Sequence, residues 1–264
     1  MVILITGITS GFGRAMAKRL AADGHKVYGT HRKDVEHIPG VSYIKVEATD
    51  DAQVEAAVKQ VIDDEGRIDI FINNAGMGIG GPLEFSSLED ARRQMDVNWM
   101  GMVRFLHFVL PQMRAQKSGM IICFSSIGGL IGLPYQGLYS ASKYAIEGYC
   151  EALRLEVKNF GINVVVIEPG DFSTNFTAQR KCVSGTDAAA AYPSYERSLK
   201  GIEKDERTGL KPDFLADKIS KIVRKKSPRY NYIIASPLQK LSVIAKAILP
   251  RRLFYWILSK YYNL

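Results

Sequence analysis

Short apolar runs alternate with longer amphipathic segments along this chain, and this alternation is the feature that most constrains its fold. The apolar runs predict strands at residues 2–6, 26–30, 42–46, 68–72, 120–124, 163–167 and 232–235. The segments between them predict helices at residues 12–23, 51–65, 88–116 and 138–159. Strands that are joined through helices form right-handed crossovers. The pattern therefore predicts a parallel sheet that is covered by helices on both faces.

The length and composition fit one domain of this architecture. The chain has 264 residues, of which 47% are hydrophobic and 23% are charged, as in ordinary soluble globular proteins. Neither internal repeats nor a low-complexity linker divides it. We therefore expect a single doubly wound, Rossmann-like α/β domain over residues 1–264, with about seven parallel strands and a ligand crevice at their carboxyl ends.

Charge, cysteine content and hydropathy exclude several classes of protein. The net charge of +8 suits an anionic membrane, a phosphorylated cofactor or nucleic acid, but no nucleic-acid motif is present and we expect no nucleic-acid partner. Three cysteines at unrelated spacings predict neither disulfides nor a metal site. The N-terminus lacks the features of a signal peptide, and no apolar run is long enough to span a membrane. We expect a cytoplasmic protein, with peripheral attachment to a membrane left open.

A glycine-rich turn follows the first predicted strand. In ITGITSGFGRAMAKRL, Gly7, Gly11 and Gly13 lie between this strand and the first helix. Glycine allows a sharp turn and a close approach of backbone N–H groups to a pyrophosphate, and the helix N-terminus adds positive potential. The spacing is G-x-x-x-G-x-G and differs from the common dinucleotide pattern G-x-G-x-x-G. The turn predicts a dinucleotide site, with a purely structural turn as the alternative.

Basic residues follow the second predicted strand and indicate which dinucleotide is bound. A carboxylate at this point accepts hydrogen bonds from the adenosine ribose, whereas an arginine accommodates a 2′-phosphate. The chain has His31, Arg32 and Lys33 here. The planar fork of arginine can bond two phosphate oxygens at once. The segment therefore favours NADP(H) over NAD(H), and the alternative is a solvated basic turn.

Five segments together resemble the short-chain dehydrogenase/reductase family. They are TGITSGFG at residues 6–13, NNAG at 73–76, VN at 97–98, SSIGGLIGLPYQGLYSASK at 125–143 and EPGDFST at 168–174. Each segment is a weak signal by itself, but all five occur in the family's order and at its spacing over most of the chain. The block that contains Tyr139 and Lys143 is especially similar to hydroxysteroid dehydrogenases of the 17β type. The tail resembles members that act on steroids, retinoids and other lipophilic compounds.

The resemblance implies a catalytic tetrad of Asn98, Ser126, Tyr139 and Lys143. Ser126 is preferred to Ser125 because the family's serine lies thirteen residues before the tyrosine. Ser126 would hydrogen-bond the carbonyl oxygen, and Asn98 would position a water that links Lys143 to solvent. Tyrosine has an ordinary pKa of about 10, which is poor for proton exchange at neutral pH. A nearby ammonium and an oxidised nicotinamide favour tyrosinate, so we expect Lys143 to lower the pKa of Tyr139.

The resemblance also implies the residues that contact the cofactor and the substrate. The expected cofactor contacts are Gly7, Thr9, Ser10, Gly11, Phe12, Gly13, His31, Arg32, Glu47, Asn74, Ala75, Gly76, Tyr139, Lys143, Pro169, Gly170, Phe172 and Thr174. The expected substrate contacts are Ser126, Tyr139, Phe172 and Phe176. Two positions depart from the family's pattern. Glu47 stands where an aspartate near the adenine is common, and Ser10 stands where many NADP-dependent members have a second basic residue.

Two segments break the alternation of strands and helices. Residues 171–212 form a long polar insertion with several aromatic side chains, which predicts a lid over a lipophilic substrate. Residues 237–264 are apolar and basic, and they predict two short helices divided by Pro250. The apolar face of these helices either covers the substrate pocket or a subunit interface, or lies on a membrane surface.

The expected function is that of an NADP(H)-dependent oxidoreductase. It would interconvert a lipophilic ketone or aldehyde, such as a steroid, a retinoid or a keto-lipid, with the corresponding alcohol. The family resemblance implies a homodimer or a homotetramer. The alternative is a catalytically silent, NADP-binding regulatory or membrane-associated protein with the same fold. Structural upkeep does not require all four tetrad residues together, which favours the enzyme.

Overall fold

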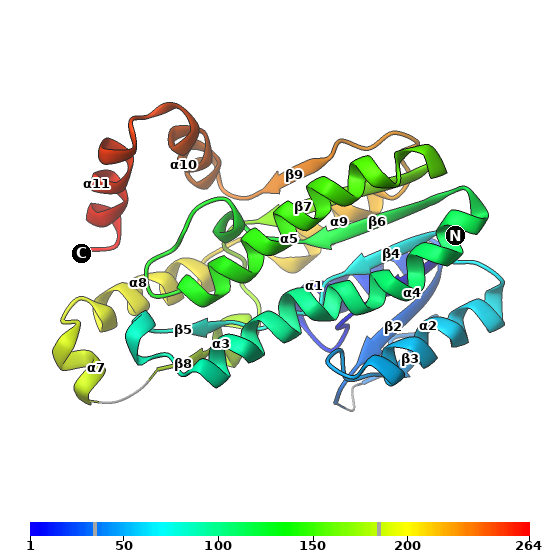
Figure 1. The fold of residues 1–264 in the computed structure, drawn as a ribbon, viewed down its shortest axis with the longest axis horizontal. Helices are drawn as coiled ribbons and strands as arrows, with labels where there is room; N and C mark the ends of the chain where they lie inside the picture. The colour runs from blue at the N-terminus through cyan, green and yellow to red at the C-terminus, as the bar shows by residue number, and fades with distance from the viewer. Residues whose placement is uncertain (34–35, 184–185) are drawn as a thin grey trace.

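A seven-stranded parallel sheet forms the centre of the molecule (Figure 1). The computed structural model describes residues 1–33, 36–183 and 186–264. The strands are β1 (Val2–Ile5), β2 (Lys26–His31), β3 (Val41–Lys45), β4 (Ile70–Asn73), β6 (Gly119–Phe124), β7 (Ile162–Pro169) and β9 (Asn231–Ile234). They lie in the order β3-β2-β1-β4-β6-β7-β9, and each neighbouring pair is parallel. The predicted strands are confirmed, and the strand order reverses between β1 and β4.

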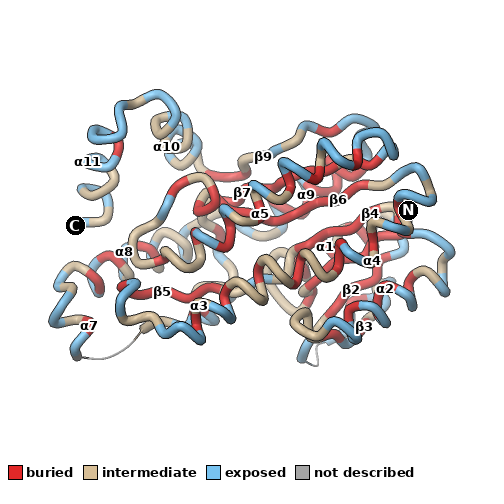
Figure 2. Tube along the Cα trace, in the orientation of Figure 1, coloured by how far each residue is buried: buried red, intermediate tan, exposed pale blue. Residues whose placement is uncertain are grey.

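Helices cover both faces of the sheet and enclose two hydrophobic cores. One face carries α2 (Asp51–Glu65), α4 (Gly101–Gln116) and α5 (Gly137–Glu156), and the other carries α1 (Gly11–Ala22) and α9 (Pro212–Ile222). Successive residues of a strand point to opposite faces. In β4, Phe71 therefore packs in the first core, and Ile70 and Ile72 pack in the second. Figure 2 shows the buried strands between helices whose outer surfaces are exposed, and this arrangement confirms the doubly wound fold.

The segment from residue 88 to residue 116 is not the single helix that its periodicity predicts. It consists of α3 (Leu88–Met95), a π-helical turn (Asp96–Met100) and α4. A π turn inserts one extra residue and interrupts the regular hydrogen bonds of the helix. A periodic apolar pattern does not report a single inserted residue, because the apolar stripe continues on both sides. Short 3₁₀ helices lie at Leu83–Phe85, Ile127–Gly129 and Lys158–Phe160.

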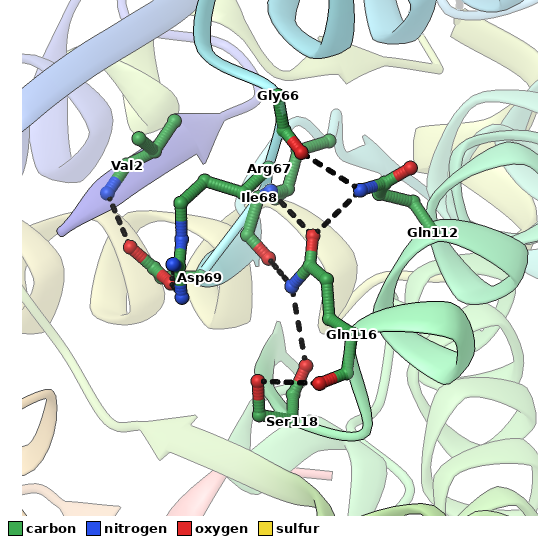
Figure 3. Close-up of polar contacts among 8 residues, drawn as sticks. All are labelled: Val2, Gly66, Arg67, Ile68, Asp69, Gln112, Gln116 and Ser118. Carbon is green, nitrogen blue, oxygen red and sulfur yellow. Dashed lines mark hydrogen bonds and ion pairs between the residues drawn. The ribbon is translucent and has the colours of Figure 1, made fainter.

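At the amino-terminal end of the sheet, polar contacts connect the segment before β4 to β1 and to the end of α4 (Figure 3). The Gln116 side chain, at the end of α4, accepts a hydrogen bond from the Ile68 N–H and donates one to the Ile68 carbonyl, both at 2.9 Å. The Asp69 carboxylate accepts from the Val2 N–H at 2.8 Å, which joins the start of β1 to the turn before β4. These contacts satisfy the backbone groups at this edge. The longer loops of the fold lie at the opposite, carboxyl-terminal edge.

The insertion at residues 171–212 contains secondary structure of its own. Its elements are α6 (Phe176–Gln179), β8 (Lys181–Cys182), α7 (Thr186–Ala191) and α8 (Tyr195–Arg207). Residues 184 and 185 of the predicted lid lie outside the described part of the chain. Strand β8 pairs in parallel with β5 (Ile79–Gly80), in the loop after β4. This pairing holds the insertion at the carboxyl ends of the main strands.

Two helices after β9 form a projection that we call the arm (residues 237–264). They are α10 (Pro237–Ile248) and α11 (Arg251–Tyr261), and Pro250 separates them as predicted. Figure 1 shows the arm projecting beyond the sheet, at the end where α8 lies. A hydrogen bond attaches the start of the arm to the rest of the domain. The Gln239 Nε2 donates to an Asp171 carboxylate oxygen at 2.5 Å. Among the residues that the structure describes, no helix has the length and apolar character needed to cross a membrane.

Candidate active site

A cavity of about 950 Å³ lies at the carboxyl ends of the strands. Its wall begins at the glycine turn after β1, passes the ends of β4, β6 and β7, and continues to α8 and the arm. This position agrees with the general rule that ligands of doubly wound sheets bind beyond the carboxyl ends of the strands. The volume is in the range of ligand sites. One continuous cavity therefore connects the predicted dinucleotide turn with the insertion and the arm.

The glycine turn has a conformation that only glycine adopts readily. Gly7 and Gly11 have φ angles of 73° and 53°, in the left-handed region. Gly13 has no room for a side chain, because a Cβ atom there would lie 2.1 Å from the Gly7 carbonyl oxygen. Gly13 therefore supports the turn from behind and is not among the residues that line the cavity.

Two polar residues hold this turn against β4. The Thr6 hydroxyl accepts hydrogen bonds from the backbone N–H groups of Asn74 and Ala75, both at 2.9 Å. The Asn74 amide donates in return to the carbonyls of Thr6 (2.9 Å) and Gly7 (3.0 Å). The NNAG segment thus fixes the glycine turn. Thr6 was not among the predicted residues, because its partners are far away in the sequence.

The basic segment after β2 lies at the same end of the cavity. Arg32 and Glu47 both line it, and their side chains form an ion pair with 3.6 Å between Nη1 and Oε2. The Arg32 side chain remains 55% exposed, so the guanidinium is accessible to a ligand. The sequence did not predict this pairing. Glu47 thus partly neutralises Arg32, the residue that indicates NADP(H).

Ser126 and Tyr139 meet in the middle of the cavity wall. Ser126 follows β6, where its hydroxyl accepts a hydrogen bond from the Gly128 N–H at 3.1 Å, and Tyr139 lies in the first turn of α5. Burial raises the pKa of Tyr139 to about 12, and a hydrogen bond with Ser126 counters part of this increase. Ser125 instead donates to the backbone carbonyl of Lys143 at 3.4 Å. Of the two serines, Ser126 is the one near enough to Tyr139 to lower its pKa, and its hydroxyl also donates to the Pro169 carbonyl at 3.4 Å.

Lys143 lies one helical turn after Tyr139 and is 6% exposed. Its ammonium donates to the Phe124 carbonyl at 2.7 Å and lies 5.7 Å from the centre of the Tyr139 ring. Burial lowers the pKa of Lys143 to about 8. In the chain by itself, the cost of burying a phenolate outweighs the contributions of Ser126 and Arg180, which lower the pKa of Tyr139. The predicted lowering of the Tyr139 pKa is therefore not reached.

Asn98 occupies the π turn and is 1% exposed. Its carbonyl oxygen accepts from the Met77 N–H at 2.8 Å, and its amide donates to the Met77 carbonyl and to Ser142 Oγ, both at 3.0 Å. The side chain thus joins the loop after β4 to α5. It is not among the residues that line the cavity.

The far end of the cavity is formed by residues that mix apolar and acidic character. The rings of Phe176 and Tyr139 lie 5.6 Å apart. Asp171, Asp205 and Glu206 also line the wall, and Glu206 forms an ion pair with Arg180, whose side chain is 1% exposed. Burial, together with the neighbouring carboxylates of Glu206 and Asp205, raises the pKa of Asp171 to about 6. No sequence pattern predicted this group, because its members come from separate segments of the insertion.

The residues present fit a nicotinamide dinucleotide. The glycine turn offers backbone N–H groups at the N-terminus of α1, and a side chain at Gly13 could not be accommodated. Of the predicted cofactor residues, all except Gly13 line the cavity, and so do the four predicted substrate contacts. A doubly wound sheet with such a turn and a Tyr–Lys pair beside one cavity defines a class of dinucleotide-binding oxidoreductases.

Comparison with known proteins gives the family. Residues 1–182 match the family model described as short chain dehydrogenase. The chain belongs to the short-chain dehydrogenase/reductase family. It is therefore an oxidoreductase, and this fold binds NAD(H) or NADP(H). A short-chain dehydrogenase from Streptomyces avermitilis has a similar structure, with a TM-score of 0.82 at 27% identity, over 97% of this chain and 95% of that one.

Three relatives indicate the range of substrates in this part of the family. The chain is 47% identical to a 3-ketodihydrosphingosine reductase of Bacteroides thetaiotaomicron, over 99% of this chain and 97% of the relative. It is 33% identical to 17-beta-hydroxysteroid dehydrogenase type 1 of Mus musculus, over 88% and 72%. It is 30% identical to an NADPH-dependent 3-dehydrocapnine reductase of Ornithobacterium rhinotracheale, over 97% and 95%. These relatives support the predicted resemblance to the 17β type and extend it to reductases of keto-lipids.

Proposed function

We propose that this protein is an NADP(H)-dependent reductase of a long-chain keto-lipid. The observation that carries the proposal is the arrangement of Ser126, Tyr139 and Lys143 along one wall of a cavity. One end of this cavity is the glycine turn, and the other end is the mixed apolar and acidic wall of the insertion and arm. A dinucleotide and a lipid could thus meet beside the tyrosine. The near full-length similarity to a 3-ketodihydrosphingosine reductase supports this substrate class.

The side chains suit proton transfer to a carbonyl oxygen. The bound cofactor would supply the hydride to the carbonyl carbon. Tyr139, with its raised pKa, is protonated at neutral pH and would donate its proton to the oxygen as negative charge develops there. Ser126 would hydrogen-bond the same oxygen. Lys143, with a pKa of about 8, could return a proton to the tyrosine near neutral pH. Asn98 would act as a positioning residue, because its bonds to Met77 and Ser142 join α5 to the cavity loop.

The basic end of the cavity supports NADP(H) as the cofactor. Arg32 is accessible at the wall and can bond two oxygens of a 2′-phosphate. Glu47 would lie near the adenosine and limit the positive charge available to the phosphate. The relative that reduces 3-dehydrocapnine is NADPH-dependent by name.

The acidic wall suggests a substrate with a positive group close to its carbonyl. Glu206 and Asp171 are near enough to raise the pKa of Tyr139, and Arg180, which is paired with Glu206, offsets part of this effect. A 2-amino ketone such as 3-ketodihydrosphingosine would place an ammonium next to the carbonyl, where these carboxylates would attract it. A steroid ketone has no such group. We therefore favour the long-chain amino ketone over steroids and retinoids.

The experiment is NADPH oxidation with 3-ketodihydrosphingosine, the same long-chain ketone without its amine, a steroid ketone and retinal. We expect the amino ketone to have the highest kcat/KM. Asp205→Asn should reduce its advantage over the amine-free ketone, while both ketones remain substrates. Equal kcat/KM values for the two ketones would exclude a role for the acidic wall.

Tyr139→Phe tests the catalytic assignment. It should lower kcat by about 10²- to 10⁴-fold, because the general acid is lost, and NADPH binding followed by fluorescence should persist. Tyr135→Phe, on the segment before α5, is the matched control and should retain turnover. If Tyr139→Phe turns over ketones at the parental rate, Tyr139 is not the acid. If the parent reduces no ketone while it binds NADPH, the silent cofactor-binding protein becomes the better interpretation.

A further inference from the structure

The arm has an outer surface that the proposed function does not use. Its inner side lines the cavity through residues such as Leu241, Ala245 and Leu258. Other apolar residues of the arm do not line the cavity and are exposed to solvent by 44 to 73%. We call the following four residues the outer face: Ile244, Ile248, Leu253 and Trp256. Figure 2 shows how much of α10 and α11 is exposed.

All the charged side chains of the arm are positive. It contains five lysines or arginines and no aspartate or glutamate, so more than half of the net charge of +8 lies in these residues. The Lys246 ammonium donates hydrogen bonds to the Leu130 carbonyl and to the Tyr144 hydroxyl. Arg251 and Arg252 are exposed next to the outer face, and neither forms an ion pair with another described residue.

The position of these two arginines is unfavourable for the helix itself. They form the first turn of α11, which contains no acidic residue. The N-terminal end of a helix carries partial positive charge, so cations there reduce helix stability. These arginines therefore do not stabilise α11. Binding to an anionic partner outside the chain would explain their position.

We propose that the outer face docks on an anionic lipid bilayer. Exposed aliphatic side chains, a tryptophan and flanking cations are the combination that binds interfacial helices to lipid headgroups and the adjoining acyl chains. A second copy of this chain fits less well. A two-fold contact would place the same cationic surface against itself, and like charges repel.

This surface is continuous with the cavity. The same two helices present the outer face to solvent and their inner side chains to the substrate end of the cavity. A docked arm would thus bring the cavity close to the bilayer, and a keto-lipid could enter without crossing water. In this respect the inference rests on the proposed lipid substrate, whereas the docking itself does not.

Flotation of the full-length protein with lipid vesicles tests the docking. We expect binding to vesicles of phosphatidylcholine with phosphatidylglycerol, weaker binding to phosphatidylcholine alone, and loss of binding as salt is raised. The variant R251E/R252E and the variant L253S/W256S should each bind at least about tenfold more weakly, since each cation contributes strongly near an anionic surface. The charge-reversed variant keeps α11 folded, because acidic residues are favourable in a first helical turn.

The matched control is R114E/K158E. It changes the net charge equally, at exposed positions just before β6 and β7, on the opposite edge of the sheet from the cavity. It should bind vesicles like the parent. If the parent does not bind anionic vesicles, or if the control loses binding as strongly as R251E/R252E, the docking is wrong. If L253S/W256S instead changes the subunit number in sedimentation and leaves vesicle binding intact, the outer face is a subunit interface.

Turnover separates this inference from the proposed function. All variants should reduce a short, water-soluble ketone at the parental rate, because none alters a cavity residue. With the keto-lipid embedded in anionic vesicles, the outer-face variants should lose at least about tenfold in rate. A parent that binds vesicles but reduces no ketone would overturn the proposed function and leave the docking standing. A parent that reduces ketones without binding vesicles would overturn only the docking.

Discussion

Tyr139 and Lys143 lie one helical turn apart, and burial acts on their pKa values in opposite directions. It raises the pKa of the phenol to about 12 and lowers the pKa of the ammonium to about 8. Both changes disfavour the charged form, as desolvation always does. The spacing in the sequence predicts that the two side chains lie on one face of a helix, and both line the cavity. The sequence could not predict how deeply the two groups are buried. Burial determines the protonation state of each group before the substrate binds.

Arg32 provides a prediction about cofactor choice at the same scale. Arg32→Ala should weaken NADPH binding by about tenfold or more and change NADH binding little, because a charge-assisted hydrogen bond is worth about 1.5–3 kcal/mol. Glu47→Gln is the companion variant. It removes the ion pair at 3.6 Å and should strengthen NADPH binding. Titration of cofactor fluorescence measures both, and equal losses for NADPH and NADH in Arg32→Ala would contradict the assignment.

At the scale of single elements, the glycine turn depends on a backbone approach that leaves no space for a methyl group. Gly13→Ala should lower the melting temperature and abolish dinucleotide binding, since its Cβ would lie 2.1 Å from the Gly7 carbonyl oxygen. Overpacking of this kind costs about 1–3 kcal/mol. Gly148→Ala is the matched control, because a Cβ there meets no atom within 4 Å and alanine favours the interior of α5. Thermal unfolding should separate the two variants.

The end of β7 contains a carboxyl group that should make stability depend on pH. Glu168 is 1% exposed, and burial raises its pKa from 4.5 to about 7. The folded chain therefore holds a proton that the unfolded chain releases, and stability falls as the pH rises from about 4.5 to 7. Glutamine keeps a partner for Asn231 and cannot ionise. Glu168→Gln should thus be more stable than the parent by about 2–3 kcal/mol at pH 8, with little difference near pH 4.5.

Urea unfolding at the two pH values measures this difference. Glu156→Gln replaces an exposed carboxyl of α5 and should match the parent at both. If Glu168→Gln shows the same stability difference from the parent at both pH values, ionisation of Glu168 is not linked to folding.

At the scale of the whole molecule, the cavity joins parts of the chain that are distant in sequence, from the glycine turn to the arm. Ala245→Trp should fill its substrate end and reduce kcat/KM for a long-chain ketone by at least about tenfold, because a filled pocket excludes the acyl chain. NADPH affinity should remain parental, since the glycine turn lies at the other end. Ala247→Trp, at an exposed position of the same helix outside the cavity wall, is the control. Similar losses in both variants would show that α10 tolerates no indole at all.

Local patterns were enough to predict the seven strands and the glycine turn, and the choice of Ser126 over Ser125 stays a prediction. Strand periodicity, glycine conformation and the Tyr–Lys spacing each arise from neighbouring residues, so they can be read along the chain. Local patterns could not predict the π turn at Asp96–Met100, nor that Asn98 joins the loop after β4 to α5. Both depend on contacts with the loop after β4.

The sequence by itself determined the architecture and the family, because these follow from short patterns in a fixed order. It also proposed site residues, nearly all of which line one cavity. Only the tertiary structure decided what surrounds them. It paired Arg32 with Glu47, collected carboxylates beside Tyr139, and placed some apolar residues of the arm along the cavity while others are exposed away from it. Burial and charge proximity arise between segments that are far apart in the chain, so they exist only once those segments are packed together.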